Sequence, residues 1–427
     1  MMQLEMPTRP SGVRKKKDFN VLNDIPPAPA DIEVALLTGG QDRHYAFGLA
    51  MALSSKVRLD VIGSDSVDSP EMHTTPRLNF LNLQGGQRLG AGLAKRVSRV
   101  LTYYIRLLRY ASIAKPQVFH ILWNNRLEIL DRTLLMVYYK LLGKKIALTA
   151  HNVNAGRRDS TDTLLNRLTL RIQYKLVDHI FVHTDKMKRE LVREFGVHER
   201  AISVIPYGIN NAVPETDLTS DQAKRRLEIR DGERTILFFG AIRPYKGLEY
   251  LIAAFQGIAA ARPDYRLIIA GEPKKGSEKY VAEIQKAING TPDQKRIIQK
   301  LQFIPDEETE LYFKAADLLV LPYTEIFQSG ILMWGLSFGL PVVAADVGSF
   351  GEDIIEGRTG FLCQPGDAAD LERTIEKYFE SDLFKDLHRR RQAIRDYACA
   401  RHSWTLAAEI TRTVYAGLLA KGQSNPS

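Results

Sequence analysis

Cysteine is scarce in this 427-residue sequence, which has only Cys363 and Cys399. Two cysteines cannot build a disulfide framework, and nothing near either of them has metal-ligand spacing. No apolar run approaches the roughly 18 residues of a membrane-spanning helix, and the first thirty residues lack the apolar segment of a signal peptide. We therefore expect the chain to stay in the cytoplasm.

Several ligand-binding signatures are also missing. The sequence has no Asp-x-Asp motif and no cluster of cysteine and histidine, so we expect neither a metal site nor a resident cofactor. Its first glycine pair lacks the G-x-G-x-x-G spacing of nicotinamide and flavin sites. The net charge of +9 favours anionic partners. Because no helix-turn-helix, RNP or zinc motif accompanies that charge, nucleic acid is not an expected partner.

Short β-type runs alternate with helical periods along most of the chain, which predicts parallel sheets built from βαβ units. Each half predicts its own doubly wound, Rossmann-like α/β domain. Ligands bind at the carboxyl ends of the strands in such sheets, so two domains facing each other would enclose a central cleft. The runs are "IEVALLTGG", "VRLDVIG", "QVFHILW", "KKIALTAHN", "DHIFVHT" and "AISVIPYG" in the first half, and "RTILFFG", "YRLIIAG", "DLLVLPY", "LPVVAAD" and "TGFLCQPG" in the second.

Turn-forming residues and helix-start signals concentrate in "GINNAVPETDLTSDQAKRRL", so we expect the seam between the domains near residues 212–222. The predicted organisation begins with a basic, disordered N-terminal arm at 1–30. An N-terminal domain at 31–215 and a C-terminal domain at 216–398 follow. A final helix and tail at 399–427 would pack back across the seam.

Two fixed cations lie in the stretch "LFFGAIRPYKGLEYLIAAF", where a buried-type strand gives way to an amphipathic helix. Arg243 and Lys246 follow the strand at the edge of the sheet where ligands bind, just before the helix begins near Gly247. Arginine offers a planar fork of donors and lysine a compact charge, and hydrogen bonds to charged groups contribute about 1.5–3 kcal/mol each. A diphosphate fits this pair, and two solvated loop cations are the alternative interpretation.

A second candidate anion site lies in "LPYTEIFQSGILMWGLSFGLPVVAADVGS". A loop carrying Glu325 and Gln328 follows a strand, and Ser329 and Gly330 open an apolar helix. The unpaired backbone N–H groups and the dipole of a helix N-terminus attract an anion, and glycine lets an oxygen approach the backbone. An ordinary serine-capped helix is the alternative.

Two further features follow strands in the first half of the chain. Gly39 and Gly40 end the first strand in "LLTGGQDRH" and permit a close approach of backbone to ligand, although a glycine pair also marks many ordinary turns. His151 directly follows a strand in "ALTAHNVNAGRRD". There it would face the cleft, either as a functional group or as a structural hydrogen-bonding residue.

From about residue 31 to 420, and most clearly in its second half, the chain resembles the retaining glycosyltransferases of family 4, which have the GT-B fold. The stretches that carry the resemblance are "FFGAIRPYKGLEYLIAAF", "RLIIAGEP", "ADLLVLPY", "SGILMWGLSFGLPVVAADVGSFGEDIIEGRTGFLCQPGD" and "HSWTLAAEITRTVY". Several ordered motifs at matching separations are more specific than any one alone.

This resemblance implies metal-independent transfer of a sugar, with retention, from a nucleotide-diphosphate donor to a glycan or lipid-linked acceptor in polysaccharide or glycolipid biosynthesis. Arg243 and Lys246 would stabilise the leaving diphosphate, and His151 would lie near the transferred sugar. The donor-binding residues that the resemblance implies are Gly39, Gly40, Glu325, Gln328, Ser329, Gly330 and Glu352. A catalytically degenerate nucleotide-sugar-binding protein is the alternative function.

One departure from the family pattern bears on that alternative. The family usually carries two glutamates eight positions apart, one at the sugar and one at the ribose of the nucleotide. In this chain the two positions fall on Ile326 and Trp334, with Glu325 beside the first. Because an indole cannot accept hydrogen bonds from ribose hydroxyls, we expect Glu352 to hold the ribose and Glu325 to reach the sugar.

Residues 93–110, "LAKRVSRVLTYYIRLLRY", form a basic amphipathic pattern. At helical spacing the apolar residues fall on one face, and Lys95, Arg99, Arg106 and Arg109 fall on the opposite face. Such a helix suits an anionic membrane surface, which would make the protein peripheral at the inner face of the membrane. A surface helix with its apolar stripe on the core is the alternative. The expected apolar stripe is Leu93, Val97, Val100, Leu101, Tyr104, Leu107 and Leu108.

Overall fold

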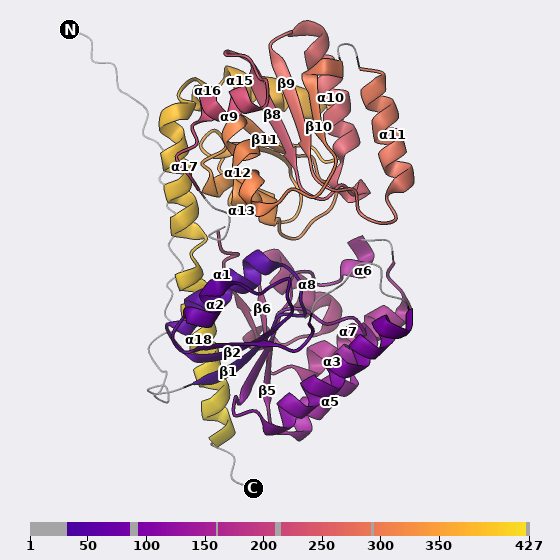
Figure 1. Ribbon diagram of the computed structural model, residues 1–427, viewed down its shortest axis with the longest axis vertical. Helices are drawn as coiled ribbons and strands as arrows, with labels where there is room; N and C mark the ends of the chain where they lie inside the picture. Colours follow the sequence, from indigo (N-terminus) through magenta and orange to yellow (C-terminus); the bar gives the residue numbers. More distant parts are fainter. Residues whose placement is uncertain (1–31, 86–92, 159–160, 210–214, 292–293, 424–427) are drawn as a thin grey trace, which may run out of the picture. The chain divides into compact units, whose positions relative to one another are not determined.

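The computed structural model describes residues 32–85, 93–158, 161–209, 215–291 and 294–423. Two parallel sheets, each flanked by helices, make up the described chain (Figure 1). The predicted fold class, two Rossmann-like α/β domains of the GT-B type, is confirmed. The predicted arm at 1–30 and the first residues of the expected seam, 212–214, lie outside the described residues.

The N-terminal domain is built on a parallel sheet with the strand order β3-β2-β1-β4-β5-β6-β7. Its strands are β1 (Glu33–Leu37), β2 (Arg58–Gly63), β3 (Leu78–Asn82), β4 (Val118–Ile121), β5 (Lys145–Thr149), β6 (His179–Val182) and β7 (Ile202–Val204). Its helices are α1 (Arg43–Ser54), α2 (Pro70–Thr74), α3 (Leu93–Ile113), α4 (Glu128–Arg132), α5 (Leu134–Leu141), α6 (Ala155–Arg158), α7 (Leu164–Leu176), α8 (Asp185–Phe195) and the 3₁₀ turn η1 (Glu199–Ala201).

The C-terminal domain repeats this plan with the strand order β10-β9-β8-β11-β12-β13. Its strands are β8 (Arg234–Phe239), β9 (Tyr265–Ala270), β10 (Ile297–Lys300), β11 (Leu318–Leu321), β12 (Val342–Ala345) and β13 (Gly360–Cys363). Its helices are α9 (Ser220–Arg226), α10 (Leu248–Ala261), α11 (Glu278–Asn289), α12 (Asp306–Ala315), α13 (Gly330–Ser337), α14 (Phe350–Asp353), α15 (Ala368–Glu380), α16 (Asp382–Lys385) and α17 (Leu387–Arg401), with the 3₁₀ turns η2 (Pro244–Lys246) and η3 (Gln294–Arg296).

Each sheet has its own buried core, because helices cover both of its faces. The inner strands β4, β6, β11 and β12 are buried along their whole length, and apart from His120 on β4 and His179 on β6 their residues are apolar. One residue of the C-terminal domain joins the other core, since Phe327 from the loop between β11 and α13 packs with the apolar cluster of the N-terminal domain. That loop therefore contacts both domains.

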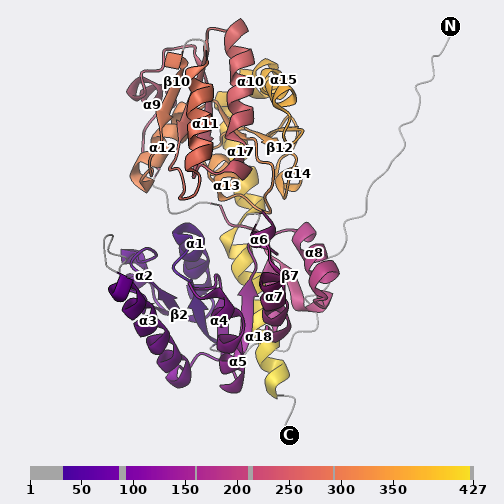
Figure 2. The same ribbon diagram turned by 90° about the vertical axis from the view of Figure 1, so that its right-hand side faces the viewer.

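The last helix, α18 (Trp404–Gln423), packs against α1 and lies beside the N-terminal sheet in both ribbon views (Figures 1 and 2). The buried Tyr415 of α18 brings its hydroxyl to 2.5 Å from His120 Nδ1 on β4. The indole Nε1 of Trp404 donates to the carbonyl oxygen of Ile209 at 2.8 Å. The C-terminal segment is thus tied to the N-terminal domain by packing and by hydrogen bonds.

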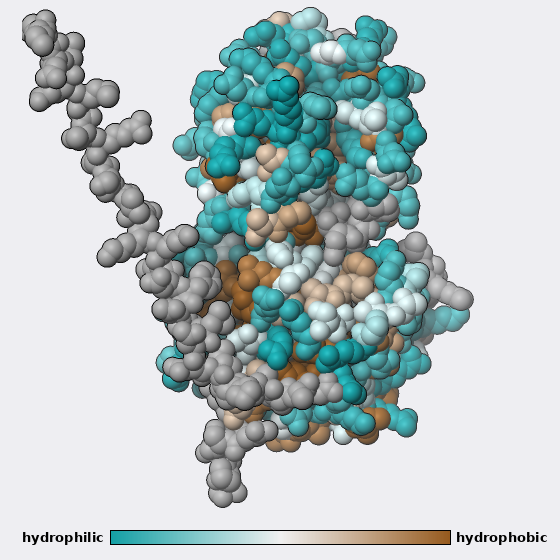
Figure 3. Space-filling view, turned by 90° about the vertical axis from the view of Figure 1, so that its left-hand side faces the viewer, coloured by the Kyte–Doolittle hydropathy of each residue, from teal (hydrophilic) through white to brown (hydrophobic). Residues whose placement is uncertain are grey.

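Most of the surface in the space-filling view is hydrophilic, with hydrophobic residues gathered in smaller areas (Figure 3). None of the helices in the described part of the chain has the length and apolar character needed to cross a bilayer.

Candidate functional site

A cavity of about 680 Å³, called here the cleft cavity, is bordered by loops at the carboxyl ends of strands from both sheets. The N-terminal domain supplies Asp42, Tyr45 and His151, and the C-terminal domain supplies Arg243 and the start of α13. This is the edge of a doubly wound sheet at which ligands bind. The central cleft that the fold class predicts is therefore present, and it has room for a small-molecule substrate.

A second cavity of about 730 Å³, the adjoining cavity, shares Asp42, His44 and Trp334 with the cleft cavity. Gly40 and Phe303 also border it, from the N-terminal and C-terminal domains respectively. Because the two cavities have walls in common, they form neighbouring compartments of one cleft.

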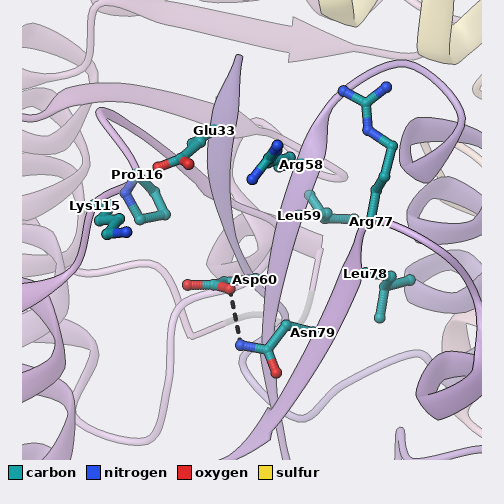
Figure 4. A pocket seen from close by; sticks show the side chains of 9 residues that line it. All are labelled: Glu33, Arg58, Leu59, Asp60, Arg77, Leu78, Asn79, Lys115 and Pro116. Atoms are coloured by element: carbon teal, nitrogen blue, oxygen red, sulfur yellow. Dashed lines mark hydrogen bonds between the residues drawn. The ribbon is translucent and has the colours of Figure 1, made fainter. Parts of the chain in front are cut away.

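A third cavity, of about 700 Å³, lies at the amino ends of β1, β2 and β3 (Figure 4). Arg58, Arg77 and Lys115 border it together with Asp60, whose Oδ1 accepts a hydrogen bond from Asn79 Nδ2 at 3.0 Å. None of the predicted site residues borders this cavity. We therefore take the two cleft compartments as the candidate site.

Arg243 and Lys246 both border the cleft cavity, as their position after β8 predicts. The turn η2 begins at Pro244 directly after Arg243 and contains Lys246, which is buried. The ammonium Nζ of Lys246 lies 5.1 Å from the centroid of the Tyr323 ring, close enough for a cation–π interaction. Gly247 has φ +64° and caps α10, and a side chain there would overlap the carbonyl oxygen of Pro322. The turn that presents both cations is thereby fixed in shape.

The start of α13 borders the same cavity through Ser329 and Gly330. Ser329 caps the helix, and its Oγ accepts a hydrogen bond from the backbone N–H of Leu332 at 3.4 Å. A Cβ at Gly330 would lie 3.3 Å from the hydroxyl of Tyr207, so glycine keeps this end of the helix open. The side-chain amide of Gln328 donates to Asp353 Oδ2 at 3.2 Å, which orients the loop before the helix.

His151 borders the cleft cavity from the N-terminal domain. Its ring stacks on Trp123 with centroids 4.0 Å apart and planes at 5°, and it meets Tyr45 edge to face at 4.5 Å. Burial, with further contributions from His183 and His120, holds the pKa of His151 well below its ordinary value. The imidazole is therefore neutral near neutral pH, which suits it to hydrogen bonding with a neutral ligand group.

Four of the predicted donor-binding residues, Gly39, Gly40, Glu325 and Glu352, are not among those that border the cleft cavity. Gly39 and Gly40 have φ angles of +61° and +68°, and only Gly40 reaches the adjoining cavity. Glu325 lies in the loop after β11 without bordering either compartment, whereas its neighbour Ile326 does.

Glu352 lies on α14, and it too borders neither compartment. Its backbone carbonyl accepts a hydrogen bond from Arg401 Nη2 at 2.9 Å. Burial, reinforced by Asp353 and Asp185, raises the pKa of its carboxyl group. The structure therefore does not bring Glu352 together with the cations that would hold a diphosphate.

Trp334, at the second of the family's glutamate positions, borders both compartments from α13. Its indole also packs near Phe239, with centroids 5.8 Å apart. This position therefore lies at the cleft, and the chain offers an aromatic surface there, where the family pattern has a carboxylate.

Sequence reasoning missed several residues of the cleft. Lys274 follows β9 and borders both compartments, with Nζ 2.7 Å from Glu272 Oε2. Its place directly after a strand in "IIAGEPKK" is a signal that could have identified it. Trp123 and Tyr207 carry the same signal, since they follow β4 and β7, whereas Tyr45 lies on α1 and joins them only through tertiary packing.

The predicted apolar stripe of α3 is divided between the core and the surface. Tyr104 and Leu107 are buried in the core, whereas Val97, Leu101 and Leu108 are exposed. The described residues of the stripe share one helical face, but one edge of that face packs on the core and the other edge points outward. The side chain of Leu93 lies outside the described residues.

Both halves of the chain match glycosyltransferase families. Residues 38–213 match the family described as Glycosyltransferase Family 4, and residues 219–398 match the one described as Glycosyl transferases group 1. The chain belongs to the GT-B glycosyltransferases of family 4 and group 1. This GT-B chain carries the site residues described above on loops of both matched regions.

Curated relatives of this glycosyltransferase include D-inositol 3-phosphate glycosyltransferases. The protein from Corynebacterium diphtheriae is 28% identical over 284 residues, which cover 62% of this chain and 64% of the relative. The protein from Nocardia farcinica is 29% identical over 257 residues, 57% of this chain and 53% of the relative. The chain thus spans less than two thirds of the length of these relatives.

Solved structures show the same fold. Sucrose-phosphate synthase from Thermosynechococcus elongatus superposes with a TM-score of 0.72 at 19% identity, covering 91% of this chain and all of the other. Anabaena HepE, solved in complex with UDP and glucose, superposes with a TM-score of 0.69 at 18% identity, covering 90% of this chain and 99% of the other.

Proposed function

We propose that this glycosyltransferase takes a sugar from a nucleotide-diphosphate donor and passes it, with retention and without a metal ion, to a glycan or lipid-linked acceptor. The observation that carries the proposal is the convergence on one cavity of Arg243, Lys246 and the N-terminus of α13, with His151 on the opposite wall. Cations and helix amides on one side suit a diphosphate, and a neutral imidazole on the other suits a sugar.

The chemistry follows from where charge develops. As the bond between the anomeric carbon and the phosphate oxygen lengthens, negative charge grows on the leaving diphosphate. Arg243, Lys246 and the amides at the start of α13 would stabilise that charge, because they are already oriented by the turn η2 and the cap at Ser329. The acceptor hydroxyl would then attack from the face that the diphosphate leaves. Lys274 would add a third cation at the boundary of the two compartments.

The donor class receives support from proteins of the same fold. Anabaena HepE has been solved with UDP and with UDP-glucose, and the two structures cover 90% and 91% of this chain. The adjoining cavity next to the three cations is the compartment that we assign to the nucleoside. Its aromatic walls, Trp334, Phe239 and Phe303, suit the flat face of a base.

A degenerate protein that binds a nucleotide sugar without transferring it is the second candidate. The observation that favours it is Trp334, since this position lacks the carboxylate that the family pattern places at the ribose. Glu352, the residue expected to replace that carboxylate, does not border the cleft. Formation of a linked product, as opposed to donor binding alone, distinguishes the two functions.

The experiment begins with a thermal-shift screen of the full chain against a panel of nucleotide-diphosphate sugars, because a ligand that binds the native state raises the apparent stability. The donor that shifts the melting temperature most is then offered with glycan and lipid-linked acceptors, with and without a chelator. We expect product in both cases. Donor binding without product for any acceptor would favour the degenerate protein, and no binding at all would contradict both candidates.

An outward apolar surface of the N-terminal domain supports a proposal about where the acceptor is presented. Exposed apolar side chains continue from α3 onto α5 and α7: Leu101 is 57% exposed, Ile105 65%, Leu141 80% and Leu164 86%. α4 contacts both α5 and α7, and the hydroxyl of Tyr138 on α5 donates to a backbone carbonyl of α3. We propose that this outward surface, with the basic residues of α3, rests on an anionic membrane that presents a lipid-linked acceptor.

A further inference from the structure

A second histidine, His183, follows β6 and contacts His151. Its hydrogen bonds determine which ring nitrogen of His151 carries the hydrogen. The Nδ1 atom of His183 lies 3.3 Å from the carbonyl oxygen of Ile205. A carbonyl oxygen can only accept a hydrogen bond, so Nδ1 of His183 carries the hydrogen. Burial lowers the pKa of His183 to about 4. The hydrogen bond to Ile205 raises the pKa, but by less than burial lowers it. The ring is therefore neutral near pH 7, and its Nε2 has an unshared electron pair.

This chain of hydrogen bonds continues to the cleft. His183 Nε2 lies 3.2 Å from His151 Nδ1, and two ring nitrogens at this distance share one hydrogen. Because His183 Nε2 has none, His151 Nδ1 supplies it. A neutral imidazole with hydrogen on Nδ1 has an unshared pair on Nε2. Among the described residues, His151 Nε2 is a buried atom without a hydrogen-bond partner, as expected of an acceptor that awaits a ligand.

The ring is held in orientation as well as in tautomer. Trp123 stacks on one face of His151, and Tyr45 meets it edge to face. Tyr45 also contacts His183, with ring centroids 5.4 Å apart. These contacts leave rotation of the imidazole little freedom, so the Nε2 lone pair has a defined direction.

We propose that His183 is a positioning residue that, with the backbone carbonyl of Ile205, fixes His151 in the tautomer whose Nε2 accepts a hydrogen bond in the cleft cavity. The identity of the donor to that bond rests on the proposed function, in which the transferred sugar lies next to His151. A lone pair accepts from a sugar hydroxyl and repels a carboxylate. The site thus selects a neutral sugar with a hydroxyl at this position over a uronic acid.

The first test observes the tautomer in the full chain without substrate. In protein labelled with ¹⁵N at histidine, two-bond ¹H–¹⁵N correlation spectra separate a ring nitrogen that carries hydrogen from one that does not. Near pH 7 we expect His151 to carry its hydrogen on Nδ1, with the signals identified by their loss in His151→Gln. A hydrogen on Nε2 of His151 would overturn the proposal.

Two substitutions at His183 then separate positioning from folding. His183→Phe keeps an aromatic ring but cannot accept from His151, so the Nδ1–H form of His151 should lose its preference. His183→Gln restores an accepting carbonyl and a donating amide, and should restore that form. His179→Phe, at another buried histidine of the same β6 segment, is the control and should leave the His151 signals unchanged. Unchanged signals in His183→Phe, or no recovery in His183→Gln, would contradict the proposal.

Kinetics provide an independent readout once a donor is known. We expect kcat/KM to fall about tenfold or more in His183→Phe and to recover in His183→Gln. In wild-type protein, a donor sugar should outcompete its uronic acid counterpart. Because the spectra need no donor, a wrong tautomer would leave the transfer proposal standing, and an absence of transfer would leave the tautomer result standing.

Discussion

His44 and Trp334 meet edge to face, with ring centroids 4.9 Å apart and planes at 88°. His44 belongs to α1 and Trp334 to α13, so the contact joins the two domains at the cleft. His44 Nε2 also lies 3.2 Å from Asp306 Oδ1 at the start of α12. Asp306 therefore orients the imidazole that packs against the indole, at the position where the family pattern has a ribose-binding glutamate.

Replacement of this indole tests its part in donor binding. We expect Trp334→Ala to weaken the binding of a nucleoside diphosphate roughly fivefold or more, because a lost aromatic contact costs about 1 kcal/mol. Trp334→Phe keeps an aromatic wall and should bind nearly as well as wild type. Isothermal titration calorimetry with the nucleoside diphosphate identified in the donor screen measures both. Equal affinities for Trp334→Ala and wild type would remove Trp334 from the nucleoside compartment.

The buried cation of the cleft should be essential for turnover. Lys246→Met keeps most of the side-chain volume and removes the charge that, in the proposed function, stabilises the leaving diphosphate. We expect kcat/KM to fall at least about a hundredfold with the fold intact. Lys275→Met, which removes an exposed lysine that borders neither compartment, is the matched control and should keep its rate. A near-normal rate in folded Lys246→Met would return this lysine to a structural role.

The docking of α18 is sensitive to one small residue. A Cβ added at Gly48 of α1 would overlap the indole ring of Trp404. We expect Gly48→Ala to lower the free energy of unfolding by about 1–3 kcal/mol, as overpacking does. Gly417→Ala, on α18 itself, meets open space and should be neutral or stabilising by up to about 1 kcal/mol. Urea denaturation measures the change in the free energy of unfolding for each variant. A Gly48→Ala variant as stable as wild type would argue against this docking of α18.

Buried histidines should make stability depend on pH. Burial lowers the pKa of His120 to about 3, and both its ring nitrogens are hydrogen-bonded inside the core. In the unfolded chain its pKa is about 6.5. Between these two values the unfolded state binds more protons. The contribution of His120 to the free energy of unfolding is therefore fully present above about pH 6.5, and it is lost as the pH falls toward 3.

The measurement compares the free energy of unfolding near pH 7, 6 and 5 in two variants. His120→Phe cannot titrate, so its stability should fall less steeply over this range than that of wild type. His388→Gln, at an exposed histidine of α17, should keep the wild-type slope. If His120→Phe retained the full slope, other groups would be responsible for the pH dependence.

Membrane association should depend on the outward apolar surface of the N-terminal domain. Wild-type protein should sediment with anionic liposomes at low ionic strength and be released as salt screens the basic residues. Leu101→Asp with Ile105→Asp should abolish the association, because both side chains are exposed on α3 and would carry charge into the interface. Leu406→Asp, on α18, is the control. Sedimentation of the α3 variant at the wild-type level would contradict this surface.

Sequence pattern predicts the inner strands of both sheets well, because strands buried on both faces are continuous apolar runs. It does not single out β3 or β10. Each is the edge strand at one end of its sheet, and each has exposed positions that interrupt the apolar run. An edge strand gains its structure from pairing with β2 or β9, and local composition carries little sign of that pairing.

The same distinction applies to the site. Arg243, Lys246 and His151 could be predicted because each follows a strand, and the carboxyl ends of parallel strands meet at one edge. His183 also follows a strand, yet its significance depends on its contacts with His151 and Ile205, which belong to different loops. No spacing along the chain encodes those contacts. Prediction from sequence thus reaches the residues whose place is set by topology and misses those whose role is set by packing.

The chain passes between the two domains twice, near Ile209 and near His402, and these two passages are joined to each other. The N–H of Ile209 donates to the carbonyl oxygen of His402 at 2.9 Å, and Trp404 Nε1 donates to the carbonyl oxygen of Ile209. Because hydrogen bonds join the two interdomain passages at one place, they act as a single pivot. A rotation about this pivot would move Tyr207 and Gly208 little, because they border the cleft cavity directly beside it. A ligand could thus enter and leave the cleft while the part of the cavity nearest the pivot keeps its shape.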